Sequence, residues 1–422
     1  MIRKTILSAS FALLAASAAF TALPARAATD AAAVVKHYAD VAHAKYEDSL
    51  TTAKALDKAI DALIATPSEE TLKAAREAWI KARVPYQQSE VYRFGNPIVD
   101  DWEGKVNAWP LDEGLIDYVD GSYGTESDEN ELYVANIIAN PKIKISGEEV
   151  DASKITPELI ESLHEAGDVE ANVTTGYHAI EFLLWGQDLN GTGPGAGNRP
   201  ASDYLEGAGA TGGHNERRRA YLKAVTQLLV SDLEEMVGNW KPNVADNYRA
   251  TLEAEPGETG LRKMLFGMGS LSLGELAGER MKVSLEANSP EDEQDCFSDN
   301  THYSHFYDAK GVRNVYLGEY TRVDGTKLSG ASLSSLVAKA DPAADTALKA
   351  DLAATEAKIQ VMVDHANKGE HYDQLIAAGN TAGNQVVRDA IAALVKQTGS
   401  IEAAAGKLGI SDLNPDNADH EF

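Results

Sequence analysis

Apolar positions recur along most of the chain with the three- and four-residue spacing of amphipathic helices. Residues 31–65 show this pattern clearly, with Val34, Tyr38 and Val41 on one predicted face. After a break, Ser68 is a good N-cap for a second helix, because acidic residues follow it in the first turn. Patterns that repeat every second residue, as in strands, are nearly absent. The sequence therefore predicts an all-α fold.

The later helical segments are separated by long ornamented loops. Residues 121–131 are polar and glycine-containing, and residues 142–155 have room for one or two short strands. The glycine-rich residues 190–198 lack the Gly-Lys-Ser/Thr ending of a phosphate-binding loop, so we interpret them as a connection. Further helices are predicted from Glu216 to about Trp240, from Leu261 to Ala287, from Pro342 (capped by Asp341) to about Ala366, and from about Ala382 to Lys396.

Two short motifs occur twice, in the same order. Gly176–Glu181 aligns with Gly274–Glu279, sharing glycine, alanine and glutamate at equal offsets. Arg218–Leu222 and Arg313–Leu317 share arginine, tyrosine and leucine, and they follow the respective glycines by 42 and 39 residues. This repetition predicts an internally duplicated helical unit. Leu276 replaces His178 in the second copy, so only the first copy keeps an imidazole.

The N-terminus has the pattern of a secretory signal peptide. Two basic residues precede an apolar stretch that ends at an Ala-x-Ala site, which predicts a signal peptide over residues 1–27. We expect an N-terminal helical half at 28–212 and a C-terminal half at 213–422. No later stretch reaches the roughly 18 to 20 apolar residues of a membrane span, so we expect a soluble protein exported to a bacterial periplasm.

The chain of 422 residues is strongly acidic, with a formal net charge of −27. Removing Arg3, Lys4 and Arg26 with the signal peptide would take this charge to −30. Such a surface repels nucleic acid and favours cations, although it also serves solubility alone. Cys296 is the only cysteine, which excludes an internal disulfide and a multi-cysteine zinc site.

The candidate chemistry centres on His178 and Glu181. On a helix these residues stand at i and i+3, where their side chains rise from one face and can hold one cation. Gly176 is small and lets a neighbouring helix approach closely. The alternative is a histidine hydrogen-bonded to a nearby carboxylate within a helix interface.

These residues carry a resemblance to the imelysin family, also called iron-regulated protein A or insulin-cleaving membrane protease. Gly176-x-His178-x-x-Glu181 resembles the family signature. Other blocks are similar in the family's order: Ala82-Arg83-x-x-Tyr86, Asn107-x-Trp109-Pro110-Leu111-Asp112-Glu113, Leu184-Trp185-Gly186-Gln187-Asp188, Ala277-Gly278-Glu279-Arg280-Met281 and Cys296-Phe297-Ser298-Asp299-Asn300-Thr301-His302. The resemblance implies two bundle-like halves related by pseudo-twofold symmetry, a signature near the cleft between them, and a link to iron uptake in the periplasm or at the outer membrane.

Further ligands are expected from carboxylates of the first half, and Glu90, Asp112 and Glu113 are the candidates placed best in motif order. A histidine with several carboxylates suits iron or another first-row ion, with zinc as an alternative. Arg83 and Tyr86 would then orient the carboxylates.

A second, weaker candidate site contains His302 and His305, which also stand at i and i+3, beside Asp299 and Asp308. The alternative is a polar loop whose histidines, with Cys296, cap helix ends.

The sequence favours a periplasmic metal-binding protein of iron acquisition that binds iron or an iron-bearing ligand between two helical halves. Its expected partners are the metal ion and other iron-uptake components of the envelope, and not nucleic acid. One alternative is a metallopeptidase with His178 and Glu181 as ligands, although the chain has no His-Glu-x-x-His and no Gly-x-Ser-x-Gly motif. The other is a partner-binding protein without a metal.

Overall fold

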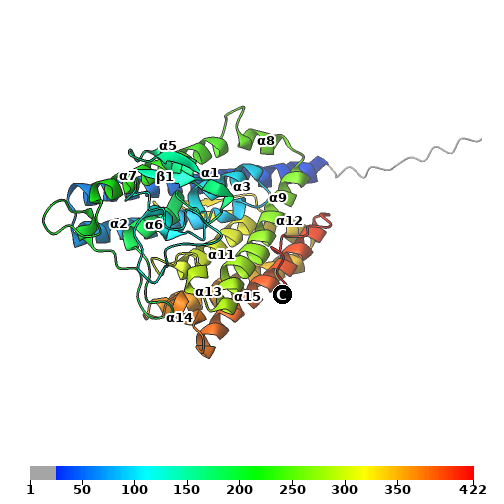
Figure 1. The fold of residues 1–422 in the computed structure, drawn as a ribbon. Coiled ribbons are helices and arrows are strands. Elements are labelled where there is room, and N and C mark those ends of the chain that lie inside the picture. The colour runs from blue at the N-terminus through cyan, green and yellow to red at the C-terminus, as the bar shows by residue number, and fades with distance from the viewer. Residues whose placement is uncertain (1–24) are drawn as a thin grey trace, which may run out of the picture.

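The computed structural model describes residues 25–422, and its secondary structure is dominated by helices (Figure 1). Residues 1–24 of the predicted signal peptide lie outside the described residues, so that assignment stays a prediction. The predicted all-α class is confirmed. The longer helices are α1 (Ala25–Ala65), α2 (Glu69–Gln87), α3 (Pro97–Asn107), α6 (Gly176–Trp185), α7 (Asn215–Trp240), α9 (Gly257–Ser270), α11 (Thr301–Leu317), α13 (Pro342–Ala366) and α15 (Thr381–Lys407).

Short elements connect these helices. The short α-helices are α4 (Glu113–Ile116), α5 (Pro157–Leu163), α8 (Tyr248–Ala254), α10 (Val283–Ala287), α12 (Leu333–Ala340) and α14 (Tyr372–Ile376). The 3-10 helices are η1 (Glu90–Tyr92), η2 (Ala166–Asp168), η3 (Ala201–Tyr204) and η5 (Pro290–Asp292), and η4 (Leu271–Lys282) is a π-helix. Two antiparallel hairpins contain β1 (Lys142–Ile145) with β2 (Glu148–Asp151), and β3 (Glu319–Thr321) with β4 (Lys327–Ser329). The first hairpin lies in the segment where the sequence left room for strands.

Two of the predicted helix starts have the expected caps. The Ser68 hydroxyl accepts a hydrogen bond from the Thr71 backbone N–H, and the Thr71 side chain accepts one from the Ser68 N–H. Asp341 caps α13 through the N–H groups of Ala343 and Ala344, with Pro342 in the first turn. These contacts satisfy backbone donors that a helix leaves unpaired, so the local sequence determines where each helix begins.

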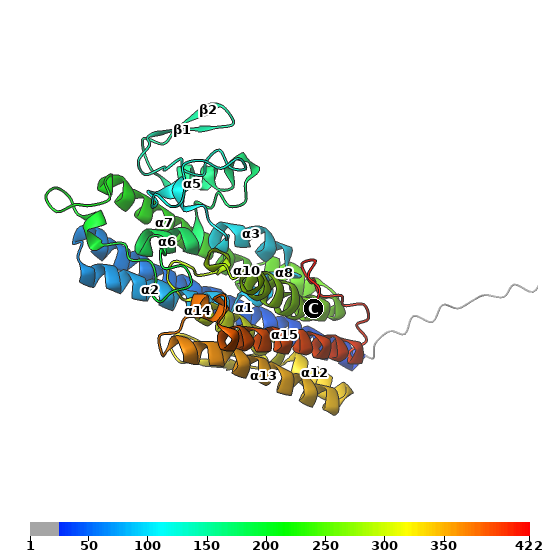
Figure 2. The ribbon, with the colours of Figure 1, turned by 60° about the horizontal axis from the view of Figure 1, so that its bottom comes forward.

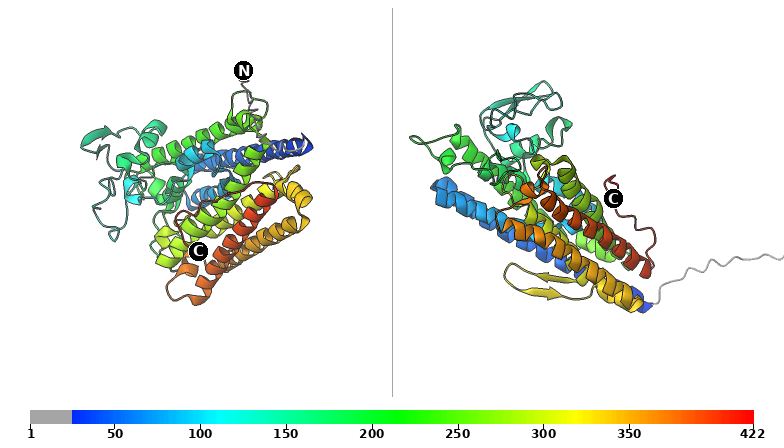
Figure 3. Two further views of the ribbon diagram at one scale, coloured as in Figure 1. Left: turned by 90° about the vertical axis from the view of Figure 1, so that its right-hand side faces the viewer. Right: turned by 90° about the horizontal axis from the view of Figure 1, so that it is seen from below.

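The long helices pack in two groups that are in contact with each other. α1 lies along α2 and α7 and also contacts α9, while α13 pairs with α15 (Figures 1 and 2). α11 packs against both α2 and α13 and thereby joins the groups. The two hairpins project from the helical body (Figure 3). None of the helices between residues 25 and 422 combines the length and apolar character that a membrane crossing requires.

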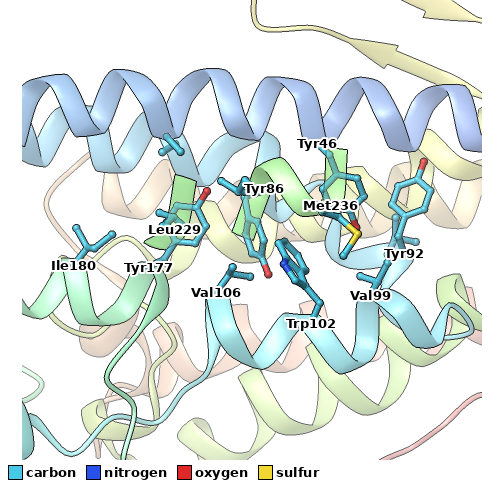
Figure 4. Packing of buried hydrophobic residues seen from close by; sticks show 14 of the residues in the cluster. Tyr46, Tyr86, Tyr92, Val99, Trp102, Val106, Tyr177, Ile180, Leu229 and Met236 are labelled. Atoms are coloured by element: carbon cyan, nitrogen blue, oxygen red, sulfur yellow. The ribbon is translucent and has the colours of Figure 1, made fainter. Parts of the chain in front are cut away.

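The main hydrophobic core contains residues from both predicted halves. Aromatic side chains of α1, α2, α3 and α6 meet there, including Tyr46, Tyr86, Trp102 and Tyr177 (Figure 4). The Tyr86 and Tyr177 ring centroids lie 4.8 Å apart. Because this core fixes α6 against α2 and α3, it also fixes the predicted metal-binding motif.

The two copies of the repeated motif lie in different kinds of helix. Gly176–Glu181 opens α6, whereas Gly274–Glu279 lies within η4, where the chain runs on from α9 into α10. Leu276 is buried, and Glu279 is exposed and lies 2.9 Å from the ring of His420. Duplication and the boundary at residue 212 stay predictions. The second copy contributes no buried carboxylate of the kind found in the first.

Candidate metal centre

The helix that carries the motif is buried along its whole length, from Gly176 to Trp185. Hydrogen bonds from neighbouring helices hold its start. The indole N–H of Trp79 donates to the Tyr177 carbonyl at 2.9 Å, and the Tyr221 hydroxyl donates to the Thr174 carbonyl at 2.9 Å. These bonds satisfy backbone oxygens in the protein interior, so they fix both the position and the rotation of α6.

Gly176 allows the close contact that positions the motif. Its φ is +78°, a left-handed value that side chains other than glycine rarely adopt. A Cβ atom at this position would lie 2.4 Å from the carbonyl oxygen of Val106 at the end of α3. The predicted role of this glycine as a spacer thus corresponds to a specific contact between α6 and α3.

His178, Glu181 and Asp295 form the candidate metal centre. His178 Nδ1 lies 2.9 Å from Glu181 Oε2 and 4.0 Å from Asp295 Oδ1. One potential ligand atom from each residue falls within 4.8 Å of the others. The three residues are 1%, 0% and 0% exposed, respectively. Among residues 30–422, no other group of three or more histidine, cysteine or acidic side chains has its ligand atoms within 4.8 Å of one another.

The remaining polar atoms of the two carboxylates are held by the loop before α11. Glu181 Oε1 accepts a hydrogen bond from the Ser298 backbone N–H at 3.0 Å. Asp295 Oδ2 accepts hydrogen bonds from the Asn300 amide at 2.9 Å and from the Ser304 hydroxyl. Glu181 Oε2 and Asp295 Oδ1 are the oxygens that face His178.

The protonation of the centre follows from its burial. Burial lowers the pKa of His178 to about 3, with a further contribution from Arg83, so the imidazole is neutral at ordinary pH. Burial, and then the nearby Asp295, raises the pKa of Glu181 well above its usual range. Burial acts most strongly on Asp295 and raises its pKa, but Arg83, His178 and the hydrogen bonds from Ser304 and Asn300 together outweigh burial and leave the pKa lowered. In the metal-free state a proton on Glu181 can bond to His178 Nδ1, and a cation between them would replace that proton.

Arg83 of α2 is the positive group beside the centre. One guanidinium nitrogen donates to Asp295 Oδ1 at 2.9 Å, and another donates to the Asn107 side-chain oxygen at 2.6 Å. The guanidinium also lies 5.1 Å from the Tyr177 ring centroid and 5.6 Å from that of Tyr86. The two residues predicted to orient carboxylates therefore lie beside the centre, with Arg83 in direct contact with Asp295 and Tyr86 packed against Arg83.

The other predicted ligands have different partners. Glu90 Oε2 lies 2.7 Å from an Arg280 guanidinium nitrogen. Asp112 accepts a hydrogen bond from the Asn130 amide at 2.5 Å. Glu113 is buried at the start of α4, and burial raises its pKa to about 7. The structure brings none of the three into the group formed by His178, Glu181 and Asp295.

The predicted second pair, His302 and His305, lies on α11 and is buried, at 4% and 0% exposed. Burial lowers the pKa of each to about 3. Their rings contact His371 and Tyr372, with centroid distances of 5.5 Å and 5.0 Å. Both histidines lie on a helix and are buried in the interior. They are therefore not part of a loop that caps helix ends.

Asp295 is the residue that sequence reasoning missed. It directly precedes the family-like block that begins at Cys296, in which the sequence points to Cys296, Asp299 and His302 instead. The sequence contains one indication of such a residue. Arg83 is predicted to lie beside the site, and an arginine on the buried face of a helix requires a carboxylate partner. The sequence contains 65 acidic residues, so this signal alone does not identify which one.

The centre offers a nitrogen ligand and two carboxylates, a donor set that suits first-row divalent ions and iron. Cys296 is not part of this group, and burial, and then the charge of Glu181, raises the pKa of its thiol well above the usual value. A cavity of about 240 Å³ is bordered by Arg83, Asn300 and Ser304, the partners of Asp295.

Comparison with known proteins agrees with this fold. Residues 42–401 match the imelysin family. A 61-residue stretch is 34% identical to iron-regulated protein A of Synechococcus elongatus, spanning 14% of this chain and 17% of that relative. The chain thus covers only a small part of that curated relative.

Two solved structures share the fold across nearly the whole chain. One, from Parabacteroides distasonis and described as an iron-regulated protein A precursor, has a TM-score of 0.63 at 20% identity, covering 91% of this chain and 97% of the other. The other is an imelysin-like protein from Psychrobacter arcticum, with a TM-score of 0.60 at 16% identity, covering 91% and 96%.

Proposed function

The chain belongs to the imelysin family, and from this premise we propose that it is a metal-binding protein of iron acquisition that holds iron at His178, Glu181 and Asp295. The observation that carries the proposal is the convergence of three ligand atoms within 4.8 Å in a fully buried position. The name of the relative in Synechococcus elongatus adds a link to iron regulation.

The charges at the centre favour a cation. With Glu181 ionised, the centre holds two negative carboxylates and one positive guanidinium, so a net negative charge lies in a medium of low dielectric. A divalent ion compensates that charge, and a proton on Glu181 compensates it in the metal-free state. Asp295 keeps its charge in both states because Arg83 contacts it.

Arg83 prepares the site before the ion arrives. Its contacts to Asn107 and Asp295 hold the Asp295 carboxylate in place, so little ordering remains to be done upon binding. The burial of all three ligands favours a bare ion, or one stripped from its carrier, over an intact iron-bearing ligand at the centre.

A peptidase is the second candidate function, because Asp295 supplies the third protein ligand that a catalytic zinc needs. Hydrolysis also needs a carbonyl group to reach the metal and a base to move protons. The ligands are at most 1% exposed, and Glu90, an acid predicted as a ligand, is paired with Arg280. The geometry therefore supports binding better than turnover.

The cellular setting is part of the same proposal. Export to the periplasm follows from the pattern at residues 1–27, and other envelope components of iron uptake would deliver or receive the ion. The acidic net charge suits a protein that attracts cations.

The test is calorimetry with ferrous iron under anaerobic conditions on the mature chain. His178→Ala, Glu181→Gln and Asp295→Asn should each weaken binding by well over tenfold, since even changes beyond the ligands cost about 10- to 100-fold. Glu279→Gln is the matched control, because it makes the same change at the exposed position of the repeated motif. Equal affinity in Glu181→Gln and Glu279→Gln would refute the site.

A further inference from the structure

A second group of buried acids lies outside the proposed iron centre. Glu293, Asp299 and Asp373 are 1%, 3% and 1% exposed. Glu293 and Asp299 belong to the loop between α10 and α11, while Asp373 belongs to α14. His371 joins the two segments, because its Nδ1 lies 3.1 Å from the carbonyl oxygen of Asp299.

Glu293 of this group borders a small cavity. Asp188, from the loop after α6, and Glu293 line an enclosed space of about 10 Å³, together with Glu291, Cys296 and Phe297. That volume is close to what one water molecule needs. The loop after α6 and the loop before α11 therefore both bring carboxylates to this enclosed space.

The buried oxygens of this group have no protein donors. Both carboxylate oxygens of Glu293, both of Asp373 and Oδ1 of Asp299 lack a hydrogen-bond partner. Two buried carboxylates elsewhere in the chain are paired with arginine: Asp117 contacts Arg199 and Arg218, and Glu90 contacts Arg280. Because an unpaired buried charge costs several kcal/mol, the group requires either protons or a cation.

Charge repulsion within the group is strong. Burial, and then Asp373, raises the pKa of Asp299 to about 8. Burial raises the pKa of Asp373 to about 7, with a contribution from Asp188. No lysine or arginine is among the main influences on the pKa of either residue or on that of Glu293. These acids therefore lack the cationic partner that Asp117 and Glu90 have.

We propose that Asp188, Glu293, Asp299 and Asp373 form a second cation site, which takes a hard divalent ion bound by carboxylate oxygens and water. Oxygen donors select ions such as Ca²⁺ or Mn²⁺ over softer metals. The oxygens are spread more widely than the ligand atoms of the iron centre, so the ion keeps water ligands or draws the side chains inward. The site uses none of the three iron ligands, and its existence does not depend on the proposed iron function.

The test uses a His178→Ala, Glu181→Gln double variant, in which the proposed iron centre is disabled. Calorimetry with Ca²⁺ and, separately, with Mn²⁺ should detect one site per chain. Asp373→Asn and Glu293→Gln should each weaken that binding by about tenfold or more, because affinity follows the number of charged ligands. Both variants keep side-chain shape and remove no hydrogen bond, and circular dichroism checks that they fold.

The matched control is Asp292→Asn, which removes the same charge one position from Glu293 on a partly exposed side chain. It should bind like the parent variant. Lack of binding of either ion at millimolar concentration would overturn the proposal, as would equal affinity in Asp373→Asn and Asp292→Asn. Loss of iron binding in the otherwise wild-type chain leaves this result unaffected, so the two sites are tested separately.

Discussion

Arg83 and Asp295 are separated by 212 residues in sequence, yet a guanidinium nitrogen of Arg83 lies 2.9 Å from Asp295 Oδ1. This ion pair is fully buried, with side chains 2% and 0% exposed. It connects α2 to the loop before α11 and positions a carboxylate 4.0 Å from His178. The contact therefore links the packing of distant segments directly to the candidate metal centre.

Replacement of Arg83 by lysine should weaken metal binding by about 10- to 100-fold. Lysine keeps the charge but cannot reproduce the planar fork that holds Asn107 and Asp295 together. Calorimetry with ferrous iron measures the effect. Arg76→Lys is the control, since Arg76 stands on the same helix and bonds the carbonyls of Leu184 and Arg199. An equal loss in both variants would indicate a general packing effect instead.

Gly176→Ala should destabilise the protein by several kcal/mol, because a left-handed φ and an overlap with the Val106 carbonyl act together. Gly191→Ala is the comparison, because Gly191 has a φ of +59° and no atom within 4 Å of its Cβ position. It should cost only about 1 kcal/mol, the price of the backbone conformation alone. Urea unfolding gives both values, and similar losses would contradict the proposed close contact.

Asp117→Asn should lower the free energy of unfolding at pH 7 by about 3–5 kcal/mol, because it leaves Arg199 and Arg218 buried without their carboxylate. Burial acts to raise the pKa of Asp117, but Arg199 and Arg218 more than offset this and lower it. Because the pKa of Asp117 is lower in the folded protein than the unfolded value near 4, its ionised carboxylate stabilises the fold at pH values above that unfolded pKa. This stabilisation is lost as the pH falls through the folded pKa.

The difference between wild type and Asp117→Asn should therefore be constant from about pH 5 to 7 and shrink below about pH 4. Denaturant unfolding at several pH values measures it. The control is Asp100→Asn, which breaks the partly exposed pair with Arg93 and should cost less than about 1 kcal/mol. A difference that grows toward acid would contradict the assigned pKa direction.

Purified protein loaded with zinc or iron should show no peptidase turnover that disappears in His178→Ala. The physical reason is the burial of all three ligands, which keeps a peptide carbonyl from the metal. Peptide cleavage assays test this, and circular dichroism confirms that the variant is folded. Chelator-sensitive cleavage that zinc restores in the wild type, and that is lost in His178→Ala, would favour the enzyme over the binding protein.

The helices and two of the three residues of the candidate centre could be predicted from the sequence because they depend on neighbours along the chain. Helical periodicity, the Ser68 cap and the Asp341–Pro342 start each involve residues within one turn, and the structure has them all. His178 and Glu181 come together for the same reason, since three residues of helix bring their side chains to 2.9 Å.

Only the tertiary structure decided which other side chains join them. Glu90 was preferred from motif order, but packing pairs it with Arg280, 190 residues away, and Arg83 holds Asp295 beside His178 instead. The same packing gathered Glu293, Asp299 and Asp373 from two segments that no periodicity connects. Local pattern determines a helix because its hydrogen bonds and caps are local, whereas the choice among 65 acids depends on which loops the folded core brings together.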